Sequence, residues 1–148
     1  MRIVVQEPAF DIGAETAAFA SGRHDMGAIV TFTGVVRDDT GTLDHLEIEH
    51  YPGMTERAIT AIADEARTRW SLGDVLVIHR HGCLAPGAPI MMVATCAPHR
   101  ADAFAAAEFL MDYLKSRAPF WKKEVTRDGA AWVAAKDADE DALTRWKG

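Results

Sequence analysis

Cysteine is scarce in this sequence, whose 148 residues include only Cys83 and Cys96. Two cysteines without CxxC spacing supply neither the ligands of a structural zinc site nor the framework of a disulfide-rich secreted domain. We therefore interpret both as reduced thiols in the core of a cytosolic protein. A catalytic role for one of them is the alternative.

Long apolar runs are also absent, because no stretch of this sequence approaches the ~20 residues that a membrane-spanning helix requires. The N-terminal segment, MRIVVQEPAF, turns charged and proline-containing too early for a signal peptide. We expect a cytoplasmic protein without membrane contact. The apolar fraction of 49% is ordinary for a globular chain, so we expect a single domain over residues 1–148.

Common catalytic signatures are missing as well: the sequence has no P-loop, no GxGxxG, no GxSxG and no HExxH. His79 and His81 have the i, i+2 spacing of a metal site on a strand. However, Arg80 lies between them and no carboxylate is nearby. We predict neither a metal site nor a cofactor.

The most informative stretch that is present runs from His99 to Glu124 and reads HRADAFAAAEFLMDYLKSRAPFWKKE. From Tyr113 to Arg127 there are five Lys or Arg and one Glu, a local balance of +4 in a chain whose net charge is -6. A basic cluster in an acidic chain indicates a local anion site, whereas uniform charge would indicate only solubility.

Apolar periodicity and turn residues predict an α+β fold with a largely antiparallel sheet. The expected helices are 11–21, 55–70, 101–117 and 137–146, and the expected strands are 2–5, 27–36, 45–51, 74–81, 90–97, 120–126 and 132–135. Segment 27–36 is apolar on both faces and therefore predicts a buried strand. The clearest helical pattern is in 101–117, whose predicted apolar stripe consists of Phe104, Ala107, Leu110, Met111 and Leu114.

Basic residues stand at element ends that suit anion binding. His99 and Arg100 open the helix 101–117, where free N–H groups and the helix dipole attract anions. Arg100 adds a guanidinium fork for a phosphate or a carboxylate. Arg37 directly follows the strand 27–36. The alternative for His99 and Arg100 is that they stand at the start of the helix without a binding role. The alternative for Arg37 is that it is a turn residue without a function.

Three lysines lie near the end of the same helix. Lys115 is in its last turn, where the dipole favours a cation for structural reasons alone. Lys122 and Lys123 point to opposite faces of the following strand, so only one of them joins Lys115. Two neighbouring lysines lower each other's pKa, which can yield a neutral amine for acid–base or nucleophilic chemistry. A solvated basic face is the alternative.

Four segments of the chain carry a resemblance to one known family. They read GAIVTFTGVVR (27–37), LEIEHYPGMTERAITAIADEARTRW (46–70), VIHRHGCLAPG (77–87) and the stretch 99–124 quoted above. In this order the segments resemble the catalytic (large) subunit of molybdopterin synthase. That resemblance implies an α/β hammerhead-like fold with an additional antiparallel β portion.

The resemblance also implies a reaction and partners. Family members are sulfurtransferases that convert cyclic pyranopterin monophosphate (precursor Z) to molybdopterin in molybdenum cofactor biosynthesis. The two sulfurs come from a ubiquitin-like small subunit whose C-terminal Gly-Gly ends in a thiocarboxylate. A homodimer of large subunits forms the centre of a heterotetramer. Because sulfur comes from the partner, no catalytic cysteine is needed.

By motif match, the resemblance implies that Lys115 and Lys122 are the essential lysines of the site. The residues that it implies for binding the pterin phosphate are Arg37, His99, Arg100, Lys115, Lys122, Lys123 and Glu124. One alternative function is a non-catalytic scaffold that binds an anion or a ubiquitin-like tail. A single-stranded nucleic-acid binder is another, but the acidity of the whole chain argues against a nucleic-acid partner.

Overall fold

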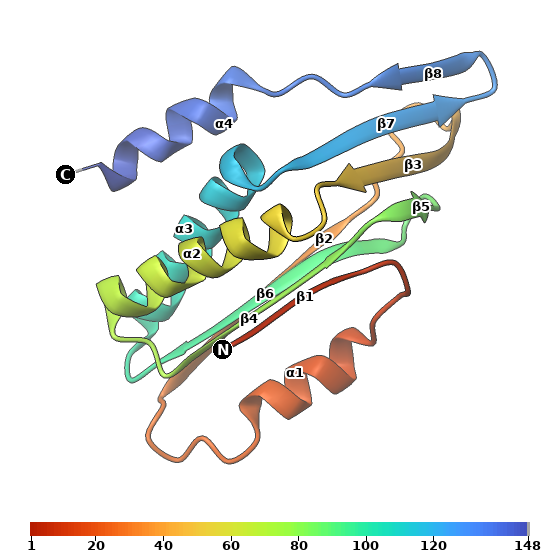
Figure 1. The fold of residues 1–148 in the computed structure, drawn as a ribbon. Helices are drawn as coiled ribbons and strands as arrows, with labels where there is room; N and C mark the ends of the chain where they lie inside the picture. The colour runs from red at the N-terminus through yellow and green to blue at the C-terminus, as the bar shows by residue number, and fades with distance from the viewer. Residues whose placement is uncertain (148) are drawn as a thin grey trace.

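Two four-stranded sheets form the frame of the molecule, for which the computed structural model describes residues 1–147. Sheet A has the order β1 (Arg2–Gln6), β4 (Asp74–Arg80), β6 (Pro89–Ala97), β2 (Ala28–Val35). Sheet B has the order β5 (Gly82–Leu84), β3 (Leu43–His50), β7 (Phe120–Thr126), β8 (Gly129–Trp132). The pair β1–β4 is parallel and the other pairs in this part of the chain are antiparallel, as expected (Figure 1).

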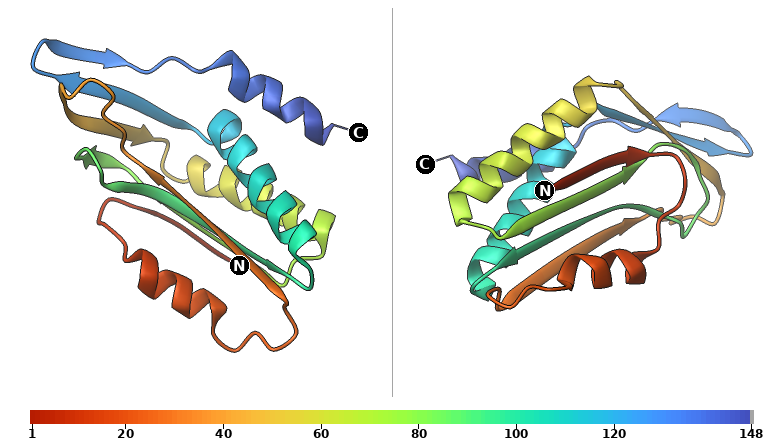
Figure 2. Two further views of the ribbon diagram at one scale, coloured as in Figure 1. Left: turned by 180° about the vertical axis from the view of Figure 1, so that it is seen from behind. Right: turned by 60° about the horizontal axis from the view of Figure 1, so that its bottom comes forward.

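Helices cover both faces of sheet A. Helix α1 (Ile12–Ala20) lies on one face, and α2 (Met54–Trp70) and α3 (Arg100–Arg117) lie together on the other (Figure 2). The short α4 (Asp137–Ala142) and the 3-10 turn η1 (Leu143–Trp146) return along α3. This arrangement confirms the predicted α+β class with its added antiparallel sheet. None of the helices in residues 1–147 is long and apolar enough to cross a bilayer.

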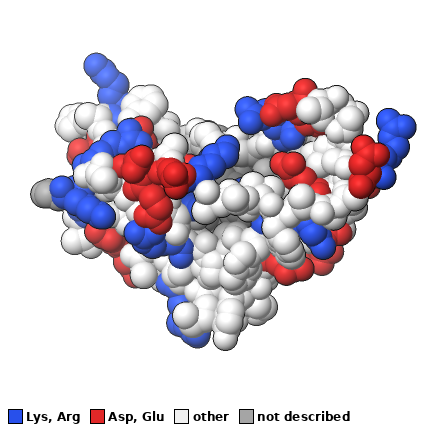
Figure 3. All heavy atoms as spheres, turned by 90° about the horizontal axis from the view of Figure 1, so that it is seen from above, with Lys and Arg blue, Asp and Glu red and all other residues white. Residues whose placement is uncertain are grey.

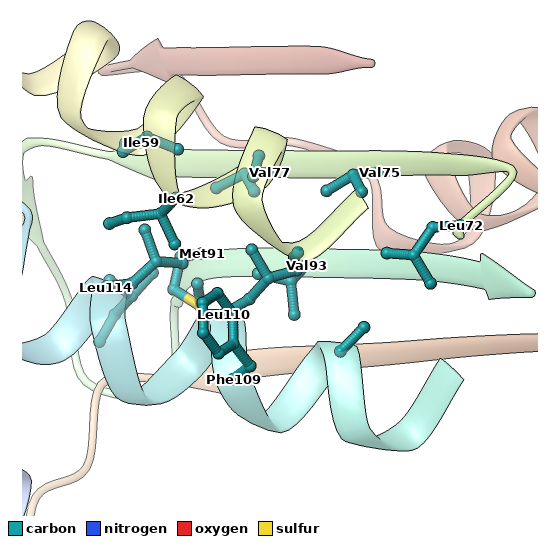
Figure 4. Packing of buried hydrophobic residues seen from close by; sticks show 14 of the residues in the cluster. Ile59, Ile62, Leu72, Val75, Val77, Met91, Val93, Phe109, Leu110 and Leu114 are labelled. Carbon is teal, nitrogen blue, oxygen red and sulfur yellow. The ribbon is translucent and has the colours of Figure 1, made fainter. Parts of the chain in front are cut away.

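The main core lies between sheet A and the pair α2–α3 (Figure 4). Small residues on the facing sides of the two helices let their backbones approach closely, while larger side chains fill the space above the sheet. The small residues are Ala63, Ala66, Ala103 and Ala106, and the larger ones include Ile59, Val77, Val93, Phe109 and Leu110, all fully or almost fully buried. Burial of each large apolar side chain contributes about 1.5–3 kcal/mol.

Exposed side chains on β2 and on the neighbouring α3 correct two of the sequence predictions, which were a buried strand over 27–36 and a buried position for Phe104. It is an edge strand of sheet A, and its side chains Ile29, Phe32 and Val35 are 38%, 44% and 49% exposed. Phe104 of the predicted α3 stripe is 61% exposed. A strand that is apolar on both faces has the same pattern whether its outer edge is paired or open, so periodicity could not distinguish the two cases. We call these four residues the β2 edge.

The register between β3 and β7 decides which way the basic residues of β7 point. Ile48 is opposite Lys122, and Glu47 is opposite Lys123. Ile48 is 2% exposed and belongs to the main core, so Lys122 faces the inside of the molecule. Lys123 lies on the outer face, as strand alternation predicted.

Candidate active site at the C-terminal end of helix α3

Lys122 is a partly buried cation beside the core. Burial lowers the pKa of its amine, and the nearby charge of Lys115 lowers it further. Lys115 itself is exposed in the last turn of α3. The chain turns at Pro119, between the two lysines, and leads into β7. The structure therefore brings together the two amines that the sequence predicted to converge.

Two further charges at this site come from the segment near α4. The positive charge of Lys136 lowers the pKa of Lys122, and the negative charge of Asp139 raises it. The Ser116 hydroxyl donates a hydrogen bond of 3.0 Å to the backbone carbonyl of Asp139 and so ties α4 to the end of α3. Sequence reasoning missed Lys136 and Asp139, because only the return of the chain places them here.

An aromatic floor lies beneath Lys122. His79 is 5% exposed, and its ring stacks on Phe120 with centroids 3.7 Å apart. Burial lowers the pKa of His79 to about 4 despite a hydrogen bond from its Nδ1 to the backbone carbonyl of Arg80, and the charge of Lys122 lowers it further. The imidazole is therefore neutral at pH 7. His50 and His81 complete this floor, with ring centroids 4.5 Å apart.

Lys123 points away from this pair of amines, whereas Glu124 is on the same face of β7 as Lys122. Lys123 Nζ is 3.2 Å from a carboxylate oxygen of Glu47 and 5.0 Å from the ring centroid of Trp132 on the outer face. Glu124 is exposed further along β7, opposite Leu46. Neither contact to Lys123 involves a residue of the lysine site.

Arg37 and the pair His99–Arg100 are separated within one chain. Ala28 at the start of β2 pairs with Ala97, just before His99, whereas Arg37 follows the other end of β2. Seven strand steps put these ends about 23 Å apart. Since α3 returns along β2 and β6, Arg37 lies at the end of the sheet where Lys115 is. One chain alone therefore does not form the expected phosphate site from Arg37, His99 and Arg100.

Arg37, His99 and Arg100 are all exposed. Arg37 makes an ion pair of 3.0 Å with Asp39 in the following turn, where both side chains are largely in solvent. His99 caps α3 with its backbone, without a side-chain hydrogen bond to the helix. All three side chains are therefore accessible to a ligand.

Figure 3 shows the face that carries α4 and the β7–β8 hairpin. Two lobes with intermixed acidic and basic side chains flank a hollow whose surface is mainly uncharged. Lys and Arg atoms border this hollow on the side of the lobe that carries the C-terminus (Figure 3). A ligand that enters here meets a mainly uncharged surface with a basic border.

Comparison with known proteins assigns the family. The model of the MoaE protein family matches residues 5–117. The chain belongs to the MoaE family. A MoaE relative from Cereibacter sphaeroides, named molybdopterin synthase catalytic subunit, is 72% identical over 146 residues, which cover 99% of this chain and 100% of the relative. The predicted family and enzyme class are confirmed.

Solved structures of MoaE proteins agree with this fold. The molybdopterin biosynthesis MoaE protein from Burkholderia ambifaria has 51% identity and a TM-score of 0.85, with 99% of this chain and 98% of that chain covered. A structure named as a complex of subunits 1 and 2 of molybdopterin-converting factor from Helicobacter pylori has 18% identity and a TM-score of 0.76, with 91% and 90% covered. The second likeness concerns the fold alone.

Proposed function

We propose that this chain acts as the catalytic subunit of a molybdopterin synthase, with its reaction centre at Lys122 and Lys115. It would transfer two sulfurs to cyclic pyranopterin monophosphate and so form molybdopterin. The main support for this position of the reaction centre is the partly buried amine of Lys122, whose pKa is lowered by burial and by Lys115. The support for the reaction is the full-length relative of 72% identity.

The role proposed for Lys122 is proton transfer. An amine with a lowered pKa is neutral more often at pH 7 and can take a proton from a reacting group. Lys115 is exposed at the end of α3, where its amine can contact an anionic group of the substrate. The alternative role for Lys122 is attack of its neutral amine on the thiocarboxylate carbon of the partner. This step would form an N–C bond, break the C–S bond and release the sulfur as hydrosulfide with one proton of the amine, leaving a covalent link between the two chains. Mass spectrometry during turnover distinguishes these two roles.

The sulfur donor in this proposal is a ubiquitin-like small subunit with a C-terminal Gly-Gly thiocarboxylate. The relative's name, catalytic subunit, implies a companion chain, and the Helicobacter pylori structure is named as a complex of two subunits. In this proposal the two-glycine tail enters the hollow of Figure 3 and reaches its basic border. We propose the cytoplasm as the location, because a thiocarboxylate and two free cysteines suit a reducing compartment.

A homodimer through strand β2 is the proposed assembly of large subunits. Strand β2, AIVTFTGV, carries no charged residue, so it lacks the charges that often protect open sheet edges from pairing. Ile29, Phe32, Val35 and Phe104 of the β2 edge add exposed apolar surface on both sides of the strand. A second copy can pair with this strand about a two-fold axis.

Such a dimer would also bring Arg37 of one copy close to His99 and Arg100 of the other. In an antiparallel pair of β2 strands, the start of one strand lies beside the end of the other. The His99 and Arg100 of a second copy would then approach Arg37 of the first. We propose that the substrate phosphate binds between Arg37 of one copy and His99–Arg100 of the other.

Reconstitution tests the proposed function. The purified chain is mixed with a thiocarboxylated small subunit and cyclic pyranopterin monophosphate, and molybdopterin is assayed. We expect product with the wild type, and little product with Lys122→Ala although that variant still binds the small subunit. Binding of the small subunit without any product from the wild type would favour the scaffold alternative instead.

A further inference from the structure

Three potential metal ligands meet on the outer face of sheet B, on the side opposite to Lys122. They are the imidazole of His45, the carboxylate of Glu47 and the thiol of Cys83, and one ligand atom of each lies within 4.8 Å of the other two. His45 and Glu47 share a face of β3 because they are two residues apart. Cys83 on β5 is directly opposite Glu47 in the strand register.

We propose that His45, Glu47 and Cys83 form a binding site for a zinc ion. In a tetrahedral zinc site the ligand atoms are roughly 3.5 Å apart, given metal–ligand distances of about 2.0–2.3 Å. His45 Nε2 and Glu47 Oε1 are already 3.0 Å apart. Cys83 is exposed, so a rotation of its side chain can bring the sulfur closer.

Neighbouring residues orient these ligands as they do in known zinc sites. Asp44 is 2.6 Å from Nδ1 of His45 and accepts a hydrogen bond from it, which orients the ring so that Nε2 faces Oε1 of Glu47. Lys123 is 3.2 Å from Oε2 of Glu47, so Oε1, which faces Nε2 of His45, is the oxygen on the side of the proposed ion. A carboxylate behind the histidine and a donor behind the glutamate are the usual outer contacts of a metal ligand.

The donor set selects the metal. One thiolate, one imidazole and one carboxylate suit a borderline-soft cation such as Zn²⁺, whereas Mg²⁺ and Ca²⁺ prefer oxygen ligands alone. Three protein ligands leave a fourth position for water or for a group of another molecule. Without a metal, Nε2 of His45 donates a hydrogen bond of 3.0 Å to Oε1 of Glu47, so zinc has to replace that proton when it binds.

This inference revises two sequence predictions and does not depend on the proposed function. The sequence predicted no metal site, because the spacing of His79 and His81 was not supported by a nearby carboxylate, and it predicted Cys83 to be a core thiol. Cys83 is exposed, because β5 is a three-residue edge strand with the cysteine on its outer face. Only the pairing of β3 with β5 brings Cys83 next to Glu47.

Zinc titration of the reduced, tag-free full-length protein tests the site. We expect saturable binding of one Zn²⁺ per chain by calorimetry. Cys83→Ser and His45→Ala should each weaken it at least about 10-fold, and Asp44→Asn by about 10- to 100-fold through loss of the outer carboxylate. With Co²⁺ in place of zinc, a thiolate-to-metal absorption band should appear in the wild type and disappear in Cys83→Ser.

His24→Ala is the matched control, because His24 is an exposed histidine outside this cluster. It should bind zinc like the wild type, and circular dichroism should show that every variant is folded. The proposal is overturned if the wild type binds no zinc saturably, or if Cys83→Ser and His45→Ala bind it as tightly as the wild type. Loss of molybdopterin synthesis plays no part in this test, so its outcome is separate from that of the proposed function.

Discussion

His79 and Phe120 stack with ring centroids 3.7 Å apart and an angle of 15° between their planes. The contact joins the central strand β4 of sheet A to the first residue of β7 in sheet B. Lys122 follows Phe120 by two residues and therefore points to the same side of β7. The stack places a buried, neutral imidazole beside the lysine site, in agreement with burial as the main cause of the lowered pKa of Lys122.

The buried His79 should make the protein less stable in mild acid. Its pKa is about 4 in the folded protein against 6.5 as the ordinary value, so between these values the unfolded chain binds a proton that the folded one does not. The contribution of the neutral His79 to the free energy of unfolding is therefore fully present above pH 6.5, and it decreases as the pH falls towards 4. From pH 7 to pH 5 the loss attributable to His79 is about 2 kcal/mol.

Urea unfolding at pH 7 and pH 5 measures this effect. The difference between the two pH values should be smaller in His79→Gln than in the wild type, whereas the exposed His24→Gln should match the wild type. His50 also lowers the stability at pH 5, because burial lowers its pKa too. The part of the pH dependence that comes from His50 should remain in His79→Gln. Equal pH dependence in His79→Gln and the wild type would contradict the assignment.

The two amines at the end of α3 should be needed for turnover, while Lys123 should not. Lys115→Ala and Lys122→Ala should fold and bind the small subunit yet lose most activity, because each removes a nitrogen from the proposed reaction centre. Lys123→Ala should be milder, since its amine faces Glu47 on the other side of the strand. Steady-state assays with circular dichroism measure this, and similar small effects in all three variants would indicate a solvated basic face.

The charge state of Lys122 can be tested separately. Lys122→Arg keeps a cation but cannot supply a neutral amine at pH 7. If proton transfer is its role, this variant should be nearly as inactive as Lys122→Ala, and the wild-type rate should rise with pH until the amine is fully deprotonated. Substantial activity of Lys122→Arg would show that only the positive charge matters.

Arg37 and Arg100 should act on the same phosphate from different copies of the chain. Arg100→Ala and Arg37→Ala should each weaken substrate binding roughly 10- to 100-fold, the value of a charged hydrogen bond, with little effect on binding of the small subunit. At a substrate concentration that saturates only an intact site, mixing the two variants should restore roughly a quarter of wild-type turnover. Half of random dimers are mixed, and each mixed dimer has one intact site of two.

Analytical ultracentrifugation supplies the control for that experiment. Phe32→Glu places a charge on the β2 edge and should convert the dimer to a monomer. Mixing should then restore nothing when both variants also carry Phe32→Glu. If mixed variants without this change stay inactive although dimers form, the two arginines do not share a site between copies.

Neither thiol should be needed for sulfur transfer. Cys83→Ser should keep full turnover, because its sulfur is on the outer face of sheet B, away from Lys122. Cys96 is fully buried, so Cys96→Ser should lower stability without abolishing the activity of the folded protein. Turnover lost in a folded Cys83→Ser variant would point to a catalytic thiol.

The sequence by itself determined most of the elements and the pairing of the lysines. It predicted no strand at β5, and it placed the last strand at 132–135 instead of Gly129–Trp132. Apolar periodicity located α2 and α3 to within a residue at each end, because the periodic contacts that stabilise a helix are local in the sequence. Strand alternation separated Lys122 from Lys123 for the same reason. The resemblance of four segments was enough to predict the family, which residues 5–117 confirm.

Tertiary structure alone decided which surfaces are open and which distant residues meet. Local pattern could not show that β2 has no outer neighbour, that Arg37 and His99 lie at opposite ends of it, or that Cys83 faces solvent beside Glu47. Likewise, the return of α4 along α3 brings Asp139 near Lys122. Each of these depends on pairing between segments far apart in the chain, and a sequence pattern with a period of two or 3.6 residues carries no information about that pairing.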